Sequence, residues 1–137
     1  MTSIFRDGIP IDNPKLLLNL EMSQTDFCTQ LGLVKGPPGL IFEHLFNCKF
    51  LSGIESSCRV HFVEGKLKKV TLTSDQAGFY HEVHKKLSAA LGKPKRVSEG
   101  RHPDWPELTW DLETMIAELG PWEYWGCMLY SLSFERK

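Results

Sequence analysis

Apolar and polar residues along this chain of 137 residues follow two periods. Recurrence at steps of three and four residues marks an amphipathic helix, and alternation marks a strand with one buried face. The helical period occurs twice, over Ser23–Gly32 and over Asp75–Gly92, and each copy ends in Leu-Gly before β-type sequence. The pattern therefore predicts a helix-then-sheet unit that is used twice.

The first helix has clear start and stop signals. Ser23 can accept a hydrogen bond from the backbone N–H of Asp26, and Asp26 lies in the first turn, where the helix dipole favours negative charge. Gly32 can take the left-handed conformation that ends a helix. The expected buried stripe is Phe27, Cys28 and Leu31.

In the second helix, Ser74 or Asp75 is the expected cap, and Gly92 ends the helix before Pro94. Its apolar stripe is Phe79, Tyr80, Val83, Leu87, Ala90 and Leu91. His81 and His84 lie one turn apart, but a zinc site of the His-Glu-x-x-His type needs four-residue spacing and a third ligand. We interpret them as a solvated helix face and expect no metal or cofactor.

Strands are expected over 16–20, over 40–50 as one long or two short strands, over 58–73 as a hairpin, and over 127–134. The segments between them predict an irregular lead-in at 1–15, a loop at 35–39, a polar turn at 52–57 and a long polar loop at 93–106. The chain is thus predicted to be an α+β protein, mainly antiparallel sheet with two helices.

The register of the 58–73 hairpin depends on its turn. A two-residue turn at 64–65 would set Val60 opposite Lys69, which mixes core and solvent positions. A three-residue loop over 64–66 pairs Val60 with Val70, so that the apolar residues share a face. We therefore expect the longer, bulged loop.

Residues 111–119 suit a helix by propensity, whereas the Thr, Trp and Ile residues around them suit a strand, which we favour. Gly120-Pro121 is a turn signal. The alternation over 127–134 predicts a closing strand whose partner lies around 114–118.

A chain of this length is most simply one domain, 1–137, with the lead-in at 1–15, a first unit at 16–73 and a second at 74–137. The apolar fraction of 42% and the charged fraction of 24% are ordinary for a globular domain. We see no signal peptide and no run near the roughly 20 apolar residues of a membrane span, so the expected location is the cytoplasm.

The net charge of −1 argues against non-specific nucleic-acid binding and against a basic membrane-binding surface. A basic cluster is interpreted as a solvated hairpin and helix face: Lys66, Lys68, Lys69, Lys85 and Lys86. The four cysteines are expected to be reduced and buried: Cys28, Cys48, Cys58 and Cys127.

The unusual composition lies late in the chain, where large aromatic residues are mixed with acidic ones. The candidate partner-binding residues are Trp105, Trp110, Asp111, Glu113, Trp122, Glu123, Tyr124 and Trp125. Trp and Tyr dominate binding hot spots, and acidic neighbours steer a basic partner. The alternative is that some are core residues beside solubilising acids. The stretch from Trp122 to Trp125, interpreted as part of a turn, most favours an exposed patch.

The sequence contains few residues arranged as in a known catalytic motif. No nucleophile elbow or phosphate-binding loop occurs. Asp111 and Glu113 resemble the carboxylate pair of a glycosidase, and on a strand they would point to one face. A solvent-facing pair is the commoner arrangement, so no catalytic residue is predicted.

The strand, turn and capped helix from Leu16 to Gly32 resemble those of domains similar to β-lactamase inhibitor protein, although Glu21 stands where those domains usually have Gly. The hairpin from Val60 to Leu72 and a helix ending Leu-Gly-Lys-Pro at Pro94 look like the rest of such a unit. The late Trp, Ile and closing strand are similar to small cytoplasmic immunity proteins, which are encoded beside antibacterial toxins, as in type VI secretion.

This resemblance implies a protein without enzymatic activity that neutralises a cognate toxin by covering its active site. The toxin would have a basic surface facing the acidic, aromatic stretch. Two alternatives stay open: a small-ligand-binding or catalytic domain that uses the concavity of the sheet, with the histidines at its rim, and an adaptor or chaperone for a partner protein.

Overall fold

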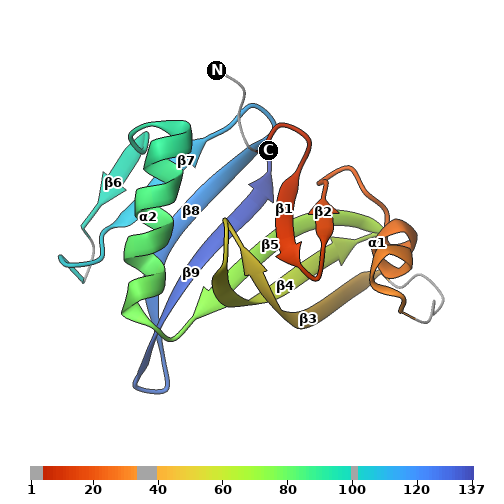
Figure 1. Ribbon diagram of the computed structural model, residues 1–137, viewed down its shortest axis with the longest axis horizontal. Coiled ribbons are helices and arrows are strands. Elements are labelled where there is room, and N and C mark those ends of the chain that lie inside the picture. The colour runs from red at the N-terminus through yellow and green to blue at the C-terminus, as the bar shows by residue number, and fades with distance from the viewer. Residues whose placement is uncertain (1–4, 34–39, 100–101) are drawn as a thin grey trace.

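The computed structural model describes residues 5–33, 40–99 and 102–137, and the predicted loop at 35–39 lies outside this part. The described residues form two helices and nine strands (Figure 1). In chain order they are β1 (Ile9–Asn13), β2 (Leu16–Leu18), α1 (Gln24–Leu31), β3 (Ile41–Phe50), β4 (Ile54–Val63), β5 (Lys66–Ser74), α2 (Ala77–Leu91), β6 (Arg96–Ser98), β7 (Glu107–Asp111), β8 (Met115–Tyr124) and β9 (Cys127–Arg136).

All nine strands join one sheet in the order β2-β1-β3-β4-β5-β9-β8-β7-β6, and every pairing is antiparallel. The expected class, α+β with a mainly antiparallel sheet and two helices, is confirmed. Figure 1 shows a twisted sheet, with α2 lying across β8 and β9 and α1 at the opposite end, beside β3 and β4.

The core lies on the face of the sheet that carries α2. One row of paired residues, Val60, Val70, Phe134 and Ala117, crosses four adjacent strands, and each side chain is fully buried. Because side chains alternate along a strand, the neighbouring residues point to the other face. That face bears half-buried or exposed polar side chains on the same strands and is open to water.

The signals of the first helix are confirmed. The Ser23 hydroxyl accepts from the Asp26 N–H at 3.1 Å, and Gly32 ends α1 at φ 70°. Phe27 is fully buried, and its ring centroid lies 5.4 Å from that of Phe62 on β4. The helix is therefore anchored on the core face by one aromatic side chain.

The second helix starts later than predicted. Its N-cap is Gln76, which makes no side-chain cap bond, so neither Ser74 nor Asp75 caps it. The Ser74 hydroxyl accepts instead from the Gln76 N–H at 3.1 Å, in a turn just before the helix. The predicted stripe is confirmed for its buried members, Phe79, Tyr80, Val83 and Leu87.

The hairpin of β4 and β5 has the predicted pairing, with Val60 opposite Val70. The prediction of a three-residue loop is wrong, because the turn holds only Glu64 and Gly65, with φ 52° and 79°. The register shifts within the ladder instead, so that Lys68 is the extra residue of a β-bulge. An extra residue in the strand puts the apolar residues of β4 and β5 on one face, as an extra residue in the loop would.

The lead-in is not irregular throughout, since Ile9–Asn13 form β1. Ile9 and Ile11 are buried at alternating positions, which is strand periodicity. Pro10 is tolerated because β1 pairs with β3 only from Ile11 onward, so its missing N–H costs no bond on that side.

Two predicted polar segments also contain strand. The turn expected at 52–57 is shorter, because β4 begins at the buried Ile54. The long loop expected at 93–106 contains the exposed edge strand β6. Both strands lack a clear alternation of apolar and polar residues in the sequence. Two serines follow close after Ile54 in β4, and β6 has no buried face.

The strand favoured for 111–119 is confirmed, as β7 and β8 with a short turn between them, and β8 is the predicted partner of the closing strand β9. Gly120-Pro121 is not a turn, because both residues lie inside β8. Pro121 lies past the last β7–β8 pair, where no ladder bond is required of it. Gly120 leaves room for Glu107, whose Cγ would lie 3.1 Å from an added Cβ.

All four cysteines are unpaired, and three are buried. The predicted burial is wrong for Cys127, the first residue of β9, because it lies at the exposed tip of the β8–β9 hairpin. Neither helix in the described part of the chain has the length and apolar character needed to cross a membrane.

Candidate functional site

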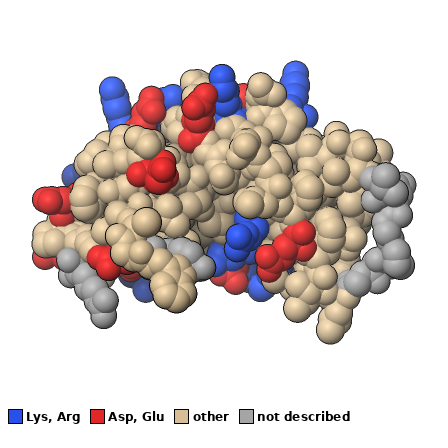
Figure 2. All heavy atoms as spheres, turned by 90° about the horizontal axis from the view of Figure 1, so that it is seen from below, with Lys and Arg blue, Asp and Glu red and all other residues tan. Residues whose placement is uncertain are grey.

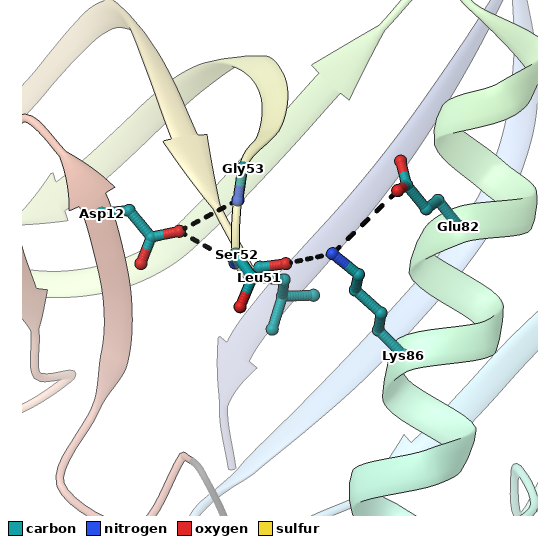
Figure 3. Close-up of polar contacts among 6 residues, drawn as sticks. All are labelled: Asp12, Leu51, Ser52, Gly53, Glu82 and Lys86. Carbon is teal, nitrogen blue, oxygen red and sulfur yellow. Dashed lines mark hydrogen bonds and ion pairs between the residues drawn. The ribbon is translucent and has the colours of Figure 1, made fainter.

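Three hairpin turns of the sheet contain residues with positive φ that are not glycine, a conformation that is unfavourable for most side chains. In the β3–β4 turn, Asp12 of β1 accepts from the N–H groups of Ser52 and Gly53 at 2.9 and 3.3 Å. Lys86 of α2 donates to the Leu51 carbonyl at 2.6 Å (Figure 3). This turn is held from two sides by other elements of the core face.

The β4–β5 turn is also tied to its surroundings. The Glu64 N–H donates to the carbonyl of Leu40, the residue before β3, at 2.8 Å. The Gly65 carbonyl accepts from the N–H of Gln24, the first residue of α1, at 2.8 Å. Hydrogen bonds to two other segments therefore offset the backbone strain of this turn.

The β8–β9 turn has the same backbone geometry in a different setting. Trp125 and Gly126 have φ 51° and 77°, and Trp125 is 88% exposed. The tip that carries it extends past the rest of the sheet at the bottom of Figure 1. A bulky residue in this conformation costs roughly 1–2 kcal/mol, and Asn, Asp or Gly is the usual choice there. Trp125 thus holds a large, mostly exposed side chain in a conformation that usually selects a smaller residue.

The structure places Trp110 in the core, away from the other candidate residues. It is 3% exposed on the covered face of β7, and its Nε1–H donates to the Gly92 carbonyl at 3.0 Å. Its ring contacts that of His84 edge to face. Trp110 thus fixes the end of α2 to the sheet and presents no surface to a partner.

Asp111 and Glu113 do not share a strand face, because β7 ends at Asp111 and Glu113 lies in the following turn. Asp111 pairs with Lys137 and, at 2.7 Å, with Lys95. Hydrogen bonds from Lys137 and Lys95 lower the pKa of Asp111 to about 2. Both carboxylates lie at the start of β8, whereas Trp122 lies near its end.

Trp105, Trp122 and Glu123 come together at the end of β8. They line a pocket of about 340 Å³ with four residues that the sequence analysis did not assign to a site: Glu99, His102, Glu107 and Pro121. His102 Nε2 lies 3.5 Å from the Glu123 carboxylate, and the Trp105 ring packs edge to face on Tyr130 at 5.3 Å. The pocket exists because β8 continues past Glu107, the first residue of β7.

A second hollow adjoins this pocket on the open face of the sheet. It also measures about 340 Å³ and shares Glu107, Pro121 and Trp122 with the first. The rest of its lining is small, apolar or charged: Lys69, Thr71, Glu118, Leu119, Gly120, Ser131 and Ser133. Trp122 therefore lines both a pocket at the edge of β8 and a trough across the sheet.

We call the exposed part of this region the acidic–aromatic surface: Glu99, Trp105, Glu107, Trp122, Glu123 and Trp125. The chain contains no Lys or Arg from His102 to Glu135, so Glu107 and Glu123 have no basic neighbours in sequence, whereas Glu99 lies between Arg96 and Arg101. Figure 2 looks from below at the end that bears the hairpin tip; red and blue alternate along the upper rim, and red beside tan occupies the lower left. A surface of this kind attracts a basic partner.

The sequence analysis missed Glu99, His102 and Glu107 as site residues. No local motif marks them, because they reach the pocket from separate segments. The side chain of Tyr124, the remaining candidate, is outside the part that the structure describes.

A polar groove of about 940 Å³ lies elsewhere, between the β3–β4 hairpin, the end of β5 and Asn13. Its lining includes Cys48, whose Sγ lies 3.4 Å from the Ser56 hydroxyl. Hydrogen bonds from Cys58 and Ser56 lower the pKa of Cys48 to about 7. The described lining residues include no histidine to act as a base, and no group of three His, Cys, Asp or Glu among the described residues could hold a metal ion.

Comparison of the chain with protein-family models, with curated proteins and with solved structures returns no match. The function is therefore argued from the geometry and charge of the acidic–aromatic surface.

Proposed function

We propose that this chain is a protein-binding inhibitor without enzymatic activity, an immunity protein of the cytoplasm that neutralises a cognate antibacterial toxin by covering its active site. The observation that carries the proposal is Trp125, which is 88% exposed at positive φ on a projecting hairpin tip. Backbone strain at an exposed position supports a functional role for the residue that carries it. Tryptophan is the residue most enriched in binding hot spots.

The surroundings of Trp125 favour a protein partner with a basic surface. Trp122 is 43% exposed on the neighbouring strand, and Glu123 lies between the two tryptophans. Aromatic anchors bordered by carboxylates combine apolar burial with electrostatic steering of a cationic partner.

The acidic–aromatic surface and the hollows beside it can supply the area that a stable protein complex buries. A stable complex buries roughly 800 Å² on each partner, about a tenth of the 8330 Å² exposed here. The pocket and the trough share Trp122, and the hairpin tip follows it within three residues of the chain, so one partner could cover all three.

The test uses the protein encoded next to this chain, which the proposal expects to be a toxin. Replacing both Trp122 and Trp125 by Ala is expected to weaken binding at least about 30-fold, since hot-spot truncations cost about 2 kcal/mol or more. Leu45→Ala is the matched control, because Leu45 is 57% exposed on β3, at the other half of the sheet. Titration calorimetry measures both. Equal affinity of the double variant and the wild type, or a neighbour that is an ordinary metabolic enzyme, contradicts the proposal.

We also propose that residues 16–73 and 74–137 are tandem helix-plus-hairpin units. Each helix precedes an antiparallel meander in chain order, β3-β4-β5 after α1 and β7-β8-β9 after α2. The last strands of the two meanders, β5 and β9, pair antiparallel, as an approximate two-fold relation would require. Fragments divided between the units are expected to reassemble when co-expressed; fragments that never associate contradict this.

A further inference from the structure

We propose that the pocket between Trp105 and Trp122 receives one arginine side chain of the partner protein. This inference rests on the proposed protein-binding function and gives the chemistry of one contact within it. The pocket lies at the edge of β8 beyond the first residue of β7, and its lining residues belong to the acidic–aromatic surface or adjoin it.

The size and walls of the pocket suit a side chain. Its volume of about 340 Å³ lies at the small end of the range for ligand pockets. Two tryptophans line it, and their ring faces attract cations. A planar guanidinium can stack on such a ring while its N–H groups reach carboxylates, which an ammonium group cannot do as well.

Among the described lining residues, the side chains with a permanent charge are carboxylates. Glu99, Glu107 and Glu123 all contribute to it, and none of its described lining residues is Lys or Arg. His102, 3.5 Å from Glu123, offsets that carboxylate only when the imidazole is protonated. A cation is therefore the complementary ligand.

The indole N–H of Trp105 is not a contact for this cation. It is buried and has no hydrogen-bond partner among the described residues. A ligand cannot reach a donor that is closed to solvent, so the arginine assignment is carried by the two tryptophan rings and the three carboxylates.

The experiment is an NMR titration of the full chain with N-acetyl-arginine N-methylamide, observed through the indole N–H signals. We expect saturable shifts of the Trp105 and Trp122 signals. The citrulline analogue has the same shape without the charge and is expected to bind at least about fivefold more weakly, the size of one favourable ion pair. No shift with arginine, equal binding of citrulline, or tighter binding of the lysine analogue overturns the proposal.

Variants locate the binding. Glu99→Gln and Glu107→Gln are each expected to weaken arginine binding about two- to fivefold. Glu113→Gln is the matched control, because Glu113 is an exposed carboxylate at the other end of β8. Equal effects of Glu99→Gln and Glu113→Gln contradict the assignment.

The two proposals fail separately. If arginine does not bind but the tryptophan variants abolish toxin binding, only the pocket assignment falls. If arginine binds and the tryptophan variants leave toxin affinity unchanged, the arginine contact is not part of a toxin interface, and the proposed function falls with the inference.

Discussion

The turns of β4–β5 and β8–β9 each hold two residues, and their φ values are 52° and 79° in the first and 51° and 77° in the second. The first turn is tied to α1 and to the residue before β3 by two backbone hydrogen bonds of 2.8 Å. The second extends into water and carries Trp125 where the first carries Glu64. The same strained geometry thus occurs in a turn that is hydrogen-bonded to other segments at one end of the sheet and in a turn that exposes an aromatic side chain at the other.

This difference separates residues that the fold needs from residues that it does not. The β4–β5 end is bound through α1 to the core, whereas the side chain of Trp125 contributes little buried area. Substitutions at the two ends are therefore expected to divide between stability and binding.

The largest expected effect is on α1, which covers the β4–β5 end. Phe27→Ala is expected to lower the free energy of unfolding by about 3–5 kcal/mol, because a fully buried ring that packs on Phe62 is lost. Urea denaturation measures it. The matched change at the other tip, Trp125→Ala, is expected to stay within about 0.5 kcal/mol of wild type. Comparable losses at the two sites would abolish the distinction.

The second prediction concerns the shared turn geometry. Gly65→Ala and Gly126→Ala are each expected to cost about 1–2 kcal/mol of unfolding free energy, because a Cβ is unfavourable at these positive φ values. Apart from the two adjacent residues, no heavy atom of the described part of the chain lies within 4 Å of an added Cβ at either position, so backbone strain decides the cost. Denaturant midpoints of the pair should agree; a large difference means that the two turns are not equivalent.

A smaller gain is expected from relieving the strain at Trp125. Trp125→Asn is expected to stabilise the chain by about 0.5–1 kcal/mol, because Asn tolerates this conformation, while partner binding is lost. Glu64→Asn is the matched variant and should gain stability with binding unchanged. Thermal unfolding and calorimetric affinity together test the pair. A Trp125→Asn variant that keeps full affinity places the interface elsewhere.

The smallest effect is electrostatic and belongs to Asp111. Its pKa is lowered from 3.8 to about 2 by hydrogen bonds from Lys137 and Lys95. A lowered pKa in the folded chain stabilises it above the unfolded value, so this contribution is present above about pH 4 and is lost as the pH falls through about 2. Asp111→Asn should weaken the acid dependence of stability over that range and leave partner binding unchanged. Lys137→Gln should raise the Asp111 pKa, as NMR titration can show; an unchanged pKa contradicts the account.

Local signals in the sequence were sufficient for much of the fold. The cap at Ser23, the stop at Gly32 and the alternation around Val60 and Val70 act over a few residues and needed no knowledge of the rest of the chain. The bulge at Lys68 and the interior position of Gly120-Pro121 depend on what lies on the neighbouring strand. For Pro121 this is β7, which begins at Glu107 and pairs with β8 only up to Leu119, and the local sequence does not show where that pairing stops.

The sequence indicated a surface of aromatic and acidic residues, but it did not show which of these residues lie together. Trp110 and Trp122 both occur among acidic residues, yet Trp110 shares the buried parity of Leu108, and Trp122 has the parity opposite to Leu119. Because Gly120-Pro121 was interpreted as a turn, the alternation of buried and exposed residues along β8 was not followed as far as Trp122. That alternation would have distinguished the exposed Trp122 from the buried Trp110. Glu99 and His102 reach the pocket through the tertiary fold, so only the structure could place them beside Trp122.

The central claim is that Trp122 and Trp125 form a surface for binding another protein. The most direct measurement is growth of cells that express the neighbouring toxin together with wild type, with the Trp122→Ala/Trp125→Ala double variant or with Asp111→Asn. Equal amounts of folded protein are confirmed by thermal unfolding. The account predicts rescue by the wild type and by Asp111→Asn and none by the double variant. Full rescue by the double variant would contradict it.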